Sequence, residues 1–284
     1  MVRKVRTPSQ VNEADGSEAI TPFLKWPGGK RWFTANHSNL FPKTFKRYIE
    51  PFLGGASVFF FLRPKKALLG DTNRDLIRAY QTMKVNWVAL EDRLRLHDSN
   101  HGLRYYYRTR DSVPRKEINR AAWLVYLNRT CFNGIYRVNL QGRFNVPKGT
   151  KNAVLYDNDD FKVIAQALSN ADIRVSDFEL LTEEARKDDL IFADPPYTVR
   201  HNLNGFVKYN ETLFSWDDQV RLADALTRAR NRGAKIVSTN ANHSSVRELY
   251  RARGFTLKTV SRFSPISADP ESRTQFEELV ILAN

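Results

Sequence analysis

The residues with the most evident chemistry form the run Asp194-Pro195-Pro196-Tyr197, which directly follows the apolar residues 190–193. A short apolar run that stops at polar and proline residues is typical of a buried strand. The carboxylate of Asp194 and the carbonyl of Pro195 can each accept one N–H from an exocyclic amino group such as that of adenine. When both N–H groups are held in this way, the lone pair of the amino nitrogen points toward a methyl donor. Such an arrangement promotes the transfer by positioning and by local electrostatics.

The remaining residues of this run suit the same chemistry. Pro195 and Pro196 stiffen the turn, and because proline lacks an N–H, the carbonyl groups are left to face a pocket. Tyr197 can stack on a base that has been swung out of a nucleic-acid helix, since chemistry on a paired base requires extrusion. The alternative interpretation is a rigid surface turn without a catalytic role.

A second pattern is typical of a site for a nucleotide-like cofactor. Residues 50–56 read Glu-Pro-Phe-Leu-Gly-Gly-Ala, a strand-to-helix turn whose small residues let the backbone approach a ligand. Asp71 ends the next apolar run, where an acid can hydrogen-bond a ribose hydroxyl. The pattern by itself would also suit an enzyme that binds a dinucleotide.

These residues must be positioned by a layered α/β fold. Apolar runs at residues 48–50, 67–71, 190–193 and 234–238 are expected to be strands, because each ends in polar, glycine or proline residues. Helical stretches such as residues 216–231 separate them. This alternation predicts a mostly parallel sheet, in which ligands bind beyond the carboxyl ends of the strands.

The character of the sequence changes along the chain. Residues 1–20 are polar, charged and without periodicity, so they are expected to form a disordered tail. Residues 86–156 contain few strand-like runs and predict a mostly helical inserted domain. The α/β domain would then be built from two parts, residues 21–85 and residues 157–284.

Composition limits the class of partner. The formal net charge is +14, and so large a basic excess favours a polyanion, above all nucleic acid, although a basic protein without such a partner is the alternative. The chain has 42% hydrophobic residues, one cysteine, and neither a membrane-spanning run nor a signal-peptide core. We therefore expect a folded cytoplasmic protein without a membrane or metal partner, present as a monomer or weak dimer.

The order of several motifs resembles a known family. Phe23-Leu24-Lys25-Trp26-Pro27-Gly28-Gly29-Lys30 precedes the turn at residues 50–56, and the Asp194 motif follows later in the chain. Between them stand residues 128–137, Asn-Arg-Thr-Cys-Phe-Asn-Gly-Ile-Tyr-Arg, and residues 144–147, Phe-Asn-Val-Pro. The chain thereby resembles, from about residue 22 to residue 281, the Dam-type DNA adenine N6-methyltransferases of the alpha-ordered class. The resemblance implies a Rossmann-like methyltransferase sheet with an inserted target-recognition domain.

The resemblance also implies S-adenosylmethionine as methyl donor and a set of residues around it. Asp177 and Phe178 would hold the adenine of the donor, and Asp194 would border the donor as well as the target base. The other residues expected near the donor are Trp26, Gly28, Lys30, Glu50, Phe52, Gly54 and Asp71. Trp26 and Phe52 could alternatively be core aromatics, and Lys30 a surface charge. The family usually has a Gly-x-Gly pattern where this chain has Gly55 and Ala56.

Double-stranded DNA is the partner that the resemblance implies, read by a hairpin within the insertion. Arg137 is the candidate for a bidentate contact with guanine O6 and N7, with a phosphate contact as the alternative. Arg129, Arg143 and Lys148 are expected to contact phosphates. The remaining residues expected at the DNA are Lys25, Asn133, Ile135 and Pro147.

The sequence alone does not decide the target site, and it leaves two rival functions open. Relatives that act on GATC often have Arg-Tyr where this chain has Thr150-Lys151, whereas residues 194–201 followed by Tyr209 are similar to relatives that modify longer sites containing GAT. Methylation of cytosine N4 or of RNA adenine is one rival, and the cytosine enzymes more often have serine in place of Asp194. A catalytically silent DNA-binding protein is the other.

Overall fold

The computed structural model describes residues 20–139, 141–199, 214–263 and 275–283. The tail predicted over residues 1–20 therefore lies outside the described residues, apart from residue 20. The chain divides into two compact units. One, which we call the helical unit, comprises Met1–Lys30, Gly55–Arg63 and Arg78–Ser169, and the other, the sheet unit, comprises Arg31–Gly54, Pro64–Ile77 and Asn170–Asn284.

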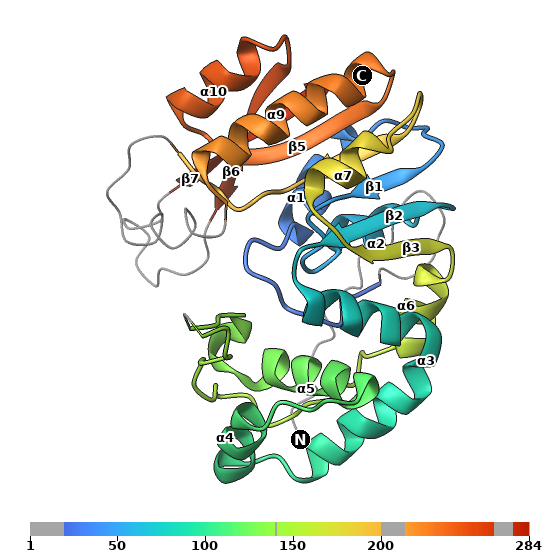
Figure 1. Ribbon diagram of the computed structural model, residues 1–284, viewed down its shortest axis with the longest axis vertical. Helices are drawn as coiled ribbons and strands as arrows, with labels where there is room; N and C mark the ends of the chain where they lie inside the picture. Colours follow the sequence, from blue (N-terminus) through green and yellow to red (C-terminus); the bar gives the residue numbers. More distant parts are fainter. Residues whose placement is uncertain (1–19, 140, 200–213, 264–274, 284) are drawn as a thin grey trace, which may run out of the picture. The chain divides into compact units, whose positions relative to one another are not determined.

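The described residues of the sheet unit form a seven-stranded sheet (Figure 1). Across the sheet its strands are β3 (Ala171–Val175), β2 (Ala67–Asp71), β1 (Tyr48–Glu50), β4 (Leu190–Ala193), β5 (Lys235–Ala241), β7 (Gln275–Ala283) and β6 (Thr256–Phe263). Strands β1 to β5 pair in parallel, whereas β7 runs antiparallel to β5 and β6. The predicted mostly parallel α/β sheet and its four expected strands are confirmed.

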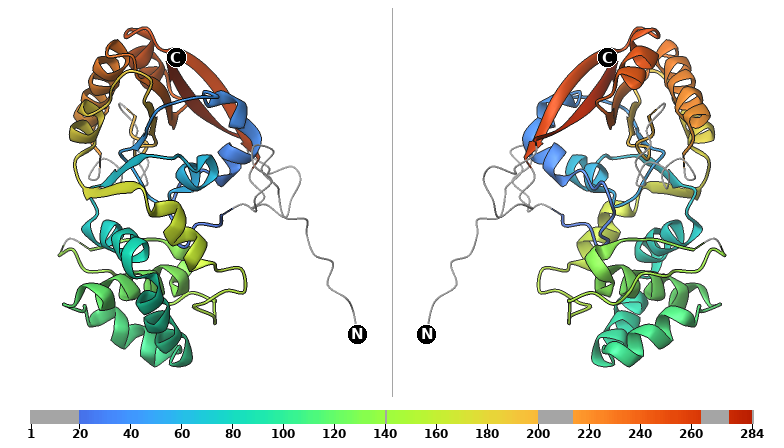
Figure 2. Two further views of the ribbon diagram at one scale, coloured as in Figure 1. Left: turned by 90° about the vertical axis from the view of Figure 1, so that its right-hand side faces the viewer. Right: turned by 90° about the vertical axis from the view of Figure 1, so that its left-hand side faces the viewer.

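Helices cover both faces of this sheet. The helices α7 (Phe178–Glu183), α9 (Trp216–Asn231) and α10 (Ser244–Arg251) lie on one face, and α1 (Arg31–His37), followed by a 3-10 turn (Ser38–Leu40), lies on the other (Figure 2). Along β4, Ile191 and Ala193 join the core beneath α9, whereas the Phe192 ring lies 6.3 Å from that of Phe33 on α1. Side chains that alternate between two covered faces explain why this strand is apolar throughout.

The strand order reverses between β1 and β4. From β1 the chain proceeds outward to β2 and β3, and it then returns to place β4 on the other side of β1. In open α/β sheets, ligands bind beyond the carboxyl ends of the strands at such a reversal. The residues at this place are Glu50, the last of β1, and Asp194, the first after β4. The fold therefore predicts a site where the sequence motifs predicted one.

The helical unit consists of helices and of a hairpin that an antiparallel bridge between Cys131 and Lys148 closes. Its helices are α2 (Ser57–Leu62), most of α3 (Arg74–Ser99), α4 (Leu103–Asp111), α5 (Glu117–Thr130), a 3-10 turn (Phe132–Gly134) and α6 (Phe161–Leu168). Residues 121–130 of α5 are all buried, so this helix is the centre of the unit. None of the described helices is long and apolar enough to cross a membrane.

The compact units differ in outline from the expected domains. The helical unit includes residues 55–63 and extends to Ser169, beyond the expected insertion at residues 86–156. Helix α3 continues through the expected boundary, although Asn86 has non-helical angles there, with φ −148° and ψ 47°. That residues 86–156 are the part that reads DNA stays a prediction.

Arg129, expected to contact phosphate, is instead part of the core of the helical unit. Its side chain is 2% exposed, and its guanidinium pairs with both carboxylate oxygens of Asp159 at 2.5 and 2.8 Å. It also donates to the carbonyls of Phe23 and Val154. A buried guanidinium whose donors serve these internal acceptors has no surface to offer a phosphate, so the predicted DNA contact of Arg129 is wrong.

Replacing Arg129 should therefore affect stability. Arg129→Met leaves the Asp159 carboxylate unpaired, and breaking a buried ion pair on one side typically costs about 3–5 kcal/mol. Urea unfolding followed by circular dichroism measures this change. Arg143→Met, which removes an exposed arginine of the hairpin, is the matched control and should leave the midpoint unchanged. Equal midpoints for both variants would contradict the structural role of Arg129.

Candidate active site

Carboxylates gather at the carboxyl ends of β1, β2 and β4. Glu50 pairs with Leu69 in the register of β1 with β2, and Asp71 stands two residues farther along, so both acids lie on the same face of the sheet. Asp194 follows β4, which pairs with the other side of β1. The structure thus places three acids at the reversal point of the sheet.

Burial dominates the electrostatics of Glu50, which is 3% exposed. Loss of solvent raises the pKa of Glu50 well above its usual value, the nearby Tyr48 hydroxyl opposes the shift, and the carboxylates of Asp194 and Asp71 raise the pKa further. The Oε2 atom of Glu50 has no hydrogen-bond partner among the described residues. Such an oxygen, beside two other acids, suits a ligand that brings hydrogen-bond donors or positive charge.

Asp71 fixes the turn that follows β1. Its Oδ2 accepts from the N–H of Gly54 at 3.3 Å, and its Oδ1 accepts from the N–H of Asn73 at 2.9 Å. Burial raises the pKa of Asp71, while these N–H groups lower it. A carboxylate has about four lone-pair positions, so acceptor capacity is left for a ribose hydroxyl.

The turn itself tolerates an alanine where the family usually has glycine. Ala56 has φ 52° and ψ 31°, in the left-handed region, and precedes the first residue of α2. A residue with a Cβ atom costs about 1–2 kcal/mol there. The neighbouring Gly54 also has a positive φ, 45°. Ala56 therefore holds a conformation that favours glycine, at a moderate energetic cost.

Two strands hold the side chains of the Asp194 motif. Thr239 of β5 donates its hydroxyl to Asp194 Oδ1 at 2.7 Å. Tyr197 donates its hydroxyl to Glu278 Oε2 of β7, also at 2.7 Å. Burial raises the pKa of Tyr197 well above its usual value, and the carboxylates of Asp194 and Glu278 raise it further, so the phenol stays neutral.

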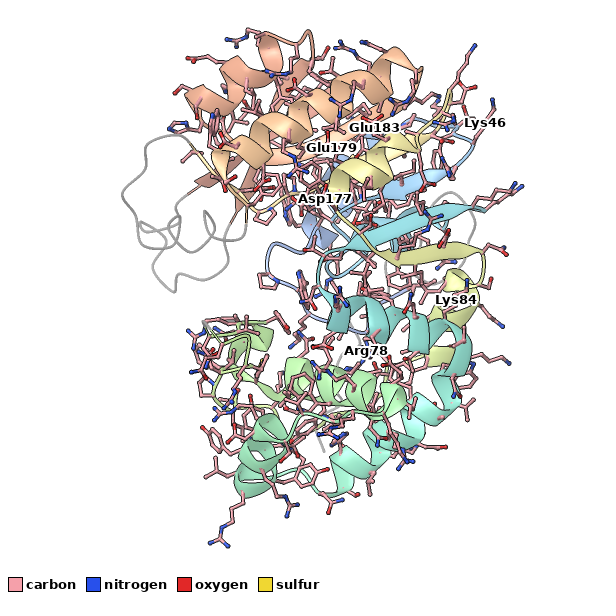
Figure 3. The ribbon with its side chains drawn as sticks, viewed as in Figure 1. Lys46, Arg78, Lys84, Asp177, Glu179 and Glu183 are labelled. Atoms are coloured by element: carbon pink, nitrogen blue, oxygen red, sulfur yellow. The ribbon has the colours of Figure 1, made fainter. Side chains whose placement is uncertain are left out.

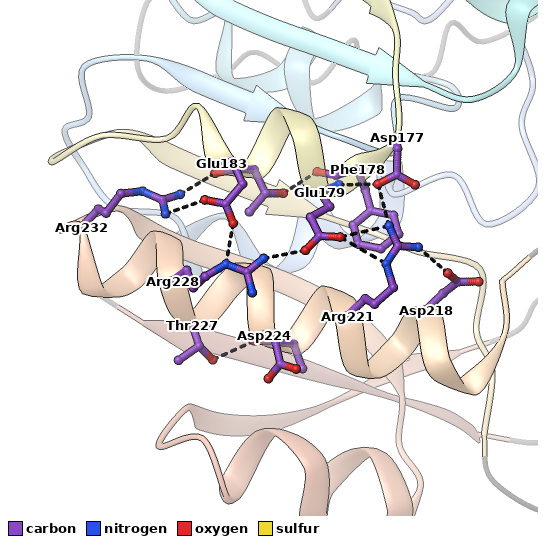
Figure 4. Close-up of polar contacts among 12 residues, drawn as sticks. Asp177, Phe178, Glu179, Glu183, Asp218, Arg221, Asp224, Thr227, Arg228 and Arg232 are labelled. Carbon is purple, nitrogen blue, oxygen red and sulfur yellow. Dashed lines mark hydrogen bonds and ion pairs between the residues drawn. The ribbon is translucent and has the colours of Figure 1, made fainter.

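Asp177 and Phe178 lie at the start of α7, facing α9 (Figures 3 and 4). The Asp177 carboxylate accepts from the N–H of Glu179 at 2.9 Å and pairs with Arg221 at 3.0 Å. The Arg221 guanidinium lies 4.8 Å from the centre of the Phe178 ring, and Phe52 stacks on that ring at 5.4 Å. The structure thus joins Phe52 to the predicted Asp177-Phe178 pair. With Phe178 5% exposed, Asp177 is the more accessible of the pair.

Other predicted residues belong to the helical unit. Trp26 stacks on Tyr136 of the hairpin at 5.2 Å and 21°, and Lys30, 4% exposed, donates to the carbonyl of Gly28 at 2.9 Å. Proximity of Trp26, Gly28 and Lys30 to the methyl donor stays a prediction. Lys25 is exposed, and its backbone N–H donates to the side chain of the buried Asn128 at 2.8 Å.

An antiparallel hairpin follows α5, where DNA reading was expected. Isolated bridges pair Cys131 with Lys148 and Val138 with Phe144. The side chains of Asn133, Arg137, Arg143 and Pro147 are exposed, and those of Ile135 and Lys148 are half-buried. The Arg137 Nε donates to Asn145 Oδ1 at 2.9 Å across the hairpin, which holds the guanidinium at the surface.

Some residues near these sites were missed by the sequence analysis. Phe132 is 50% exposed at the base of the hairpin, and an exposed aromatic beside arginines would have been the signal. Thr239 and Glu278 contact the Asp194 motif only because distant strands pair, and no local pattern marks them. Among the described residues, no group of His, Cys, Asp or Glu side chains is arranged to hold a metal ion.

Comparison with known proteins adds the family to this geometry. The family model described as D12 class N6 adenine-specific DNA methyltransferase matches residues 26–266, most of the chain. The chain belongs to this family. The D12-class enzyme is therefore an adenine-specific DNA methyltransferase, whose substrate is DNA and whose reaction requires a methyl donor.

Relatives of similar length support the assignment. The type II methyltransferase M1.LlaDCHI of Lactococcus lactis subsp. cremoris is 34% identical over 92% of this chain and 95% of its own. The type II methyltransferase M.MjaIII of Methanocaldococcus jannaschii is 33% identical over 93% and 99%. The DNA adenine methylase of Haemophilus influenzae is 32% identical over 92% and 93%. Identity at this level spans both compact units.

The raised pKa of Glu50 predicts how stability depends on pH. The folded state binds a proton at Glu50 more tightly than the unfolded state, so this contribution is complete below the unfolded pKa, 4.5, and is lost as pH rises through the folded pKa. Glu50→Gln should therefore flatten the fall in unfolding free energy above pH 4.5. Urea unfolding from pH 4 to pH 8 measures it, with the exposed Glu248→Gln as control. An unchanged pH dependence for Glu50→Gln would contradict the assignment.

Proposed function

We propose that this methyltransferase transfers a methyl group from S-adenosylmethionine to N6 of an adenine flipped out of double-stranded DNA, at GATC or at a site containing GAT. The observation that carries the proposal is the Asp194-Pro195-Pro196-Tyr197 motif at the reversal point of the sheet, beside Glu50 and Asp71. Membership in the D12 class supports the adenine N6 specificity.

The residues present fit S-adenosylmethionine as the donor. When bound, this cofactor supplies an electrophilic methyl group on a positively charged sulfur. The acids of the reversal point suit a cation, and Glu50 Oε2 is a buried acceptor without a partner among the described residues. Asp71 retains acceptor capacity for a ribose, and Asp177 can accept an N–H of the donor's adenine.

In the proposed mechanism the Asp194 motif orients the target. One Asp194 oxygen and the Pro195 carbonyl accept the two N–H groups of N6, which turns the nitrogen lone pair toward the methyl group. Tyr197 stacks on the extruded base, and its hydroxyl bond to Glu278 holds the ring. Once N6 has taken up the methyl group and the methyl–sulfur bond has broken, with its electron pair left on sulfur, N6 must release one proton. Asp194 is the ionisable acceptor that the proposal places against N6.

Base recognition is assigned to the hairpin. Its exposed Arg137 can reach a guanine edge, while Arg143 and Lys148 supply charge to the phosphates. His201 and Tyr209, which belong to the pattern of the longer sites containing GAT, lie outside the described residues. Some relatives are named type II methyltransferases and others DNA adenine methylases, so a restriction–modification role is a further proposal. We also propose a cytoplasmic monomer or weak dimer.

Removing the Asp194 carboxylate tests the chemistry. In Asp194→Ala, single-turnover methylation of duplex DNA should fall by at least about a hundredfold, because a preorganised polar contact to the reacting group is lost. Binding of S-adenosylmethionine, measured by calorimetry, should weaken far less than the rate falls, because Glu50 and Asp71 remain. The control is Asp172→Ala, which removes an exposed acid of β3 that pairs with Arg174. Full turnover in Asp194→Ala would remove this residue from the mechanism.

Substitutions in the hairpin separate base reading from phosphate contact. Arg137→Ala should cost about 1–3 kcal/mol on the preferred site, relax discrimination at one base pair, and change little on random DNA. Arg143→Ala and Lys148→Ala should weaken binding to all sequences and flatten the dependence of log affinity on log salt.

The measurement is binding of the three variants to cognate and scrambled duplexes at several salt concentrations. If Arg137→Ala lowers both affinities equally and reduces the salt slope, Arg137 contacts phosphate. Specificity would then reside in other residues of the hairpin, with Asn133 and Ile135 the next to test.

A further inference from the structure

Two residues behind the Asp194 motif share one face of the antiparallel pair β5–β7. Thr239 of β5 lies opposite Val280 of β7. Side chains along a strand alternate between faces, so Glu278, two residues from Val280, lies on the same face as Thr239. Their neighbours Ser238 and Leu279 point to the opposite face, where Leu279 joins the core beneath α9 and α10.

Thr239 contacts the first residue of the motif and Glu278 contacts the last, and the Thr239 hydroxyl also lies within hydrogen-bond reach of Tyr197. The Thr239 hydroxyl donates to Asp194 Oδ1 at 2.7 Å, and Glu278 Oε2 accepts from the Tyr197 hydroxyl at 2.7 Å. Thr239 itself is fully buried, with no exposed surface. The first and last residues of the motif are thereby tied to two strands that are hydrogen-bonded to each other.

These contacts constrain the torsions that catalysis by positioning requires. Rotation of a carboxylate or of a phenol ring about its terminal bond is intrinsically broad, so packing of the backbone does not fix either one. The Thr239 hydroxyl directs one oxygen of Asp194, which sets the plane of the carboxylate. The Glu278 carboxylate fixes where the Tyr197 hydroxyl ends, and so the direction of the ring axis. Because a phenol O–H lies in the plane of its ring, this acceptor also favours one ring plane.

We propose that Thr239 and Glu278 are positioning residues for methyl transfer: Thr239 orients Asp194 toward the target amino group, and Glu278 orients Tyr197 as the stacking surface for the extruded adenine. The proposal rests on the proposed function, in which Asp194 and Tyr197 contact the target base. Neither positioning residue touches the substrate itself.

Each of the two positioning residues has a neighbour on its own strand that can serve as a matched control. The Ser238 hydroxyl, adjacent to Thr239, donates to the carbonyl of Ala193 at 2.8 Å, so it also links β5 to β4 but does not touch Asp194. Glu277, adjacent to Glu278, is exposed and accepts from Asn242 at 2.6 Å. Loss of either counterpart removes a comparable polar contact from the same strand.

The first experiment compares Thr239→Val, Thr239→Ser and Ser238→Ala. Thr239→Val preserves the shape of the side chain and removes its hydroxyl. We therefore expect the single-turnover rate to fall at least about tenfold, which corresponds to about 1.4 kcal/mol of activation free energy. The melting temperature and the affinity for S-adenosylmethionine should be no lower than in Ser238→Ala. Thr239→Ser returns the hydroxyl and should restore most of the rate. A wild-type rate in Thr239→Val overturns the proposal, as does a loss that Ser238→Ala reproduces.

The second experiment addresses Glu278 through the state of the flipped base. With 2-aminopurine as the target base, Glu278→Leu should change the fluorescence of the complex and raise the KM for DNA, because Tyr197 loses its anchor. Glu278→Gln retains an acceptor and should resemble the wild type, as should Glu277→Gln. Identical fluorescence and KM in Glu278→Leu overturn this half of the proposal. If Thr239→Val does not fold, this arm still tests the Glu278 half of the proposal, and Thr239→Ser against Ser238→Ala still tests the Thr239 half.

The measurements distinguish a failure of the proposed function from a failure of the positioning proposal. If the wild-type protein does not methylate adenine with S-adenosylmethionine, the proposed function itself fails before any variant is compared. If the wild type methylates adenine and Asp194→Ala does not, while Thr239→Val is fully active, only the positioning role is wrong.

Discussion

The constraint on which the site depends is the parallel pairing of β1 with β4 at the reversal of strand order. This pairing brings Glu50 and Asp194 together, although 143 residues stand between them along the chain. The pairing of β1 with β2 then adds Asp71 on the same face. Parallel strands need long connections, so residues 78–169, the longest segment of the helical unit, can stand between β2 and β3 without disturbing the pairing.

Burial of acids at this place has an electrostatic consequence. Glu50 ionises with difficulty because it is desolvated and because Asp194 and Asp71 are near. A ligand that brings positive charge or hydrogen-bond donors would relieve this cost. The carboxylates whose burial is costly are therefore suited to a ligand with positive charge or hydrogen-bond donors, and the sheet supplies the stability that holds them in place.

The sequence predicted those helices, strands and site residues that a local pattern of residues determines. Residues 190–193 and 216–231 predicted β4 and α9, because an apolar run before Asp-Pro-Pro and an amphipathic stretch are local signals. Asp71 at the end of β2 was located in the same way. The antiparallel strands β6 and β7 were not anticipated, since pairing with β5 is a property of the folded chain.

Residues whose roles depend on tertiary contacts were misjudged or missed. Arg129 lies beside the hairpin in sequence and is basic, which predicted a phosphate contact, yet its partner Asp159 is 30 residues away and makes it a core ion pair. Thr239 and Glu278 carry no motif of their own. For them, the signal is the register of β5 with β7.

The most direct test of the account is to map modified bases in DNA from cells that lack other adenine methylation and express this protein or its Asp194→Ala variant. The account predicts N6-methyladenine at one short sequence, GATC or a site containing GAT, in the wild-type sample and none in the variant sample. N4-methylcytosine, or N6-methyladenine that persists in Asp194→Ala, would contradict the account.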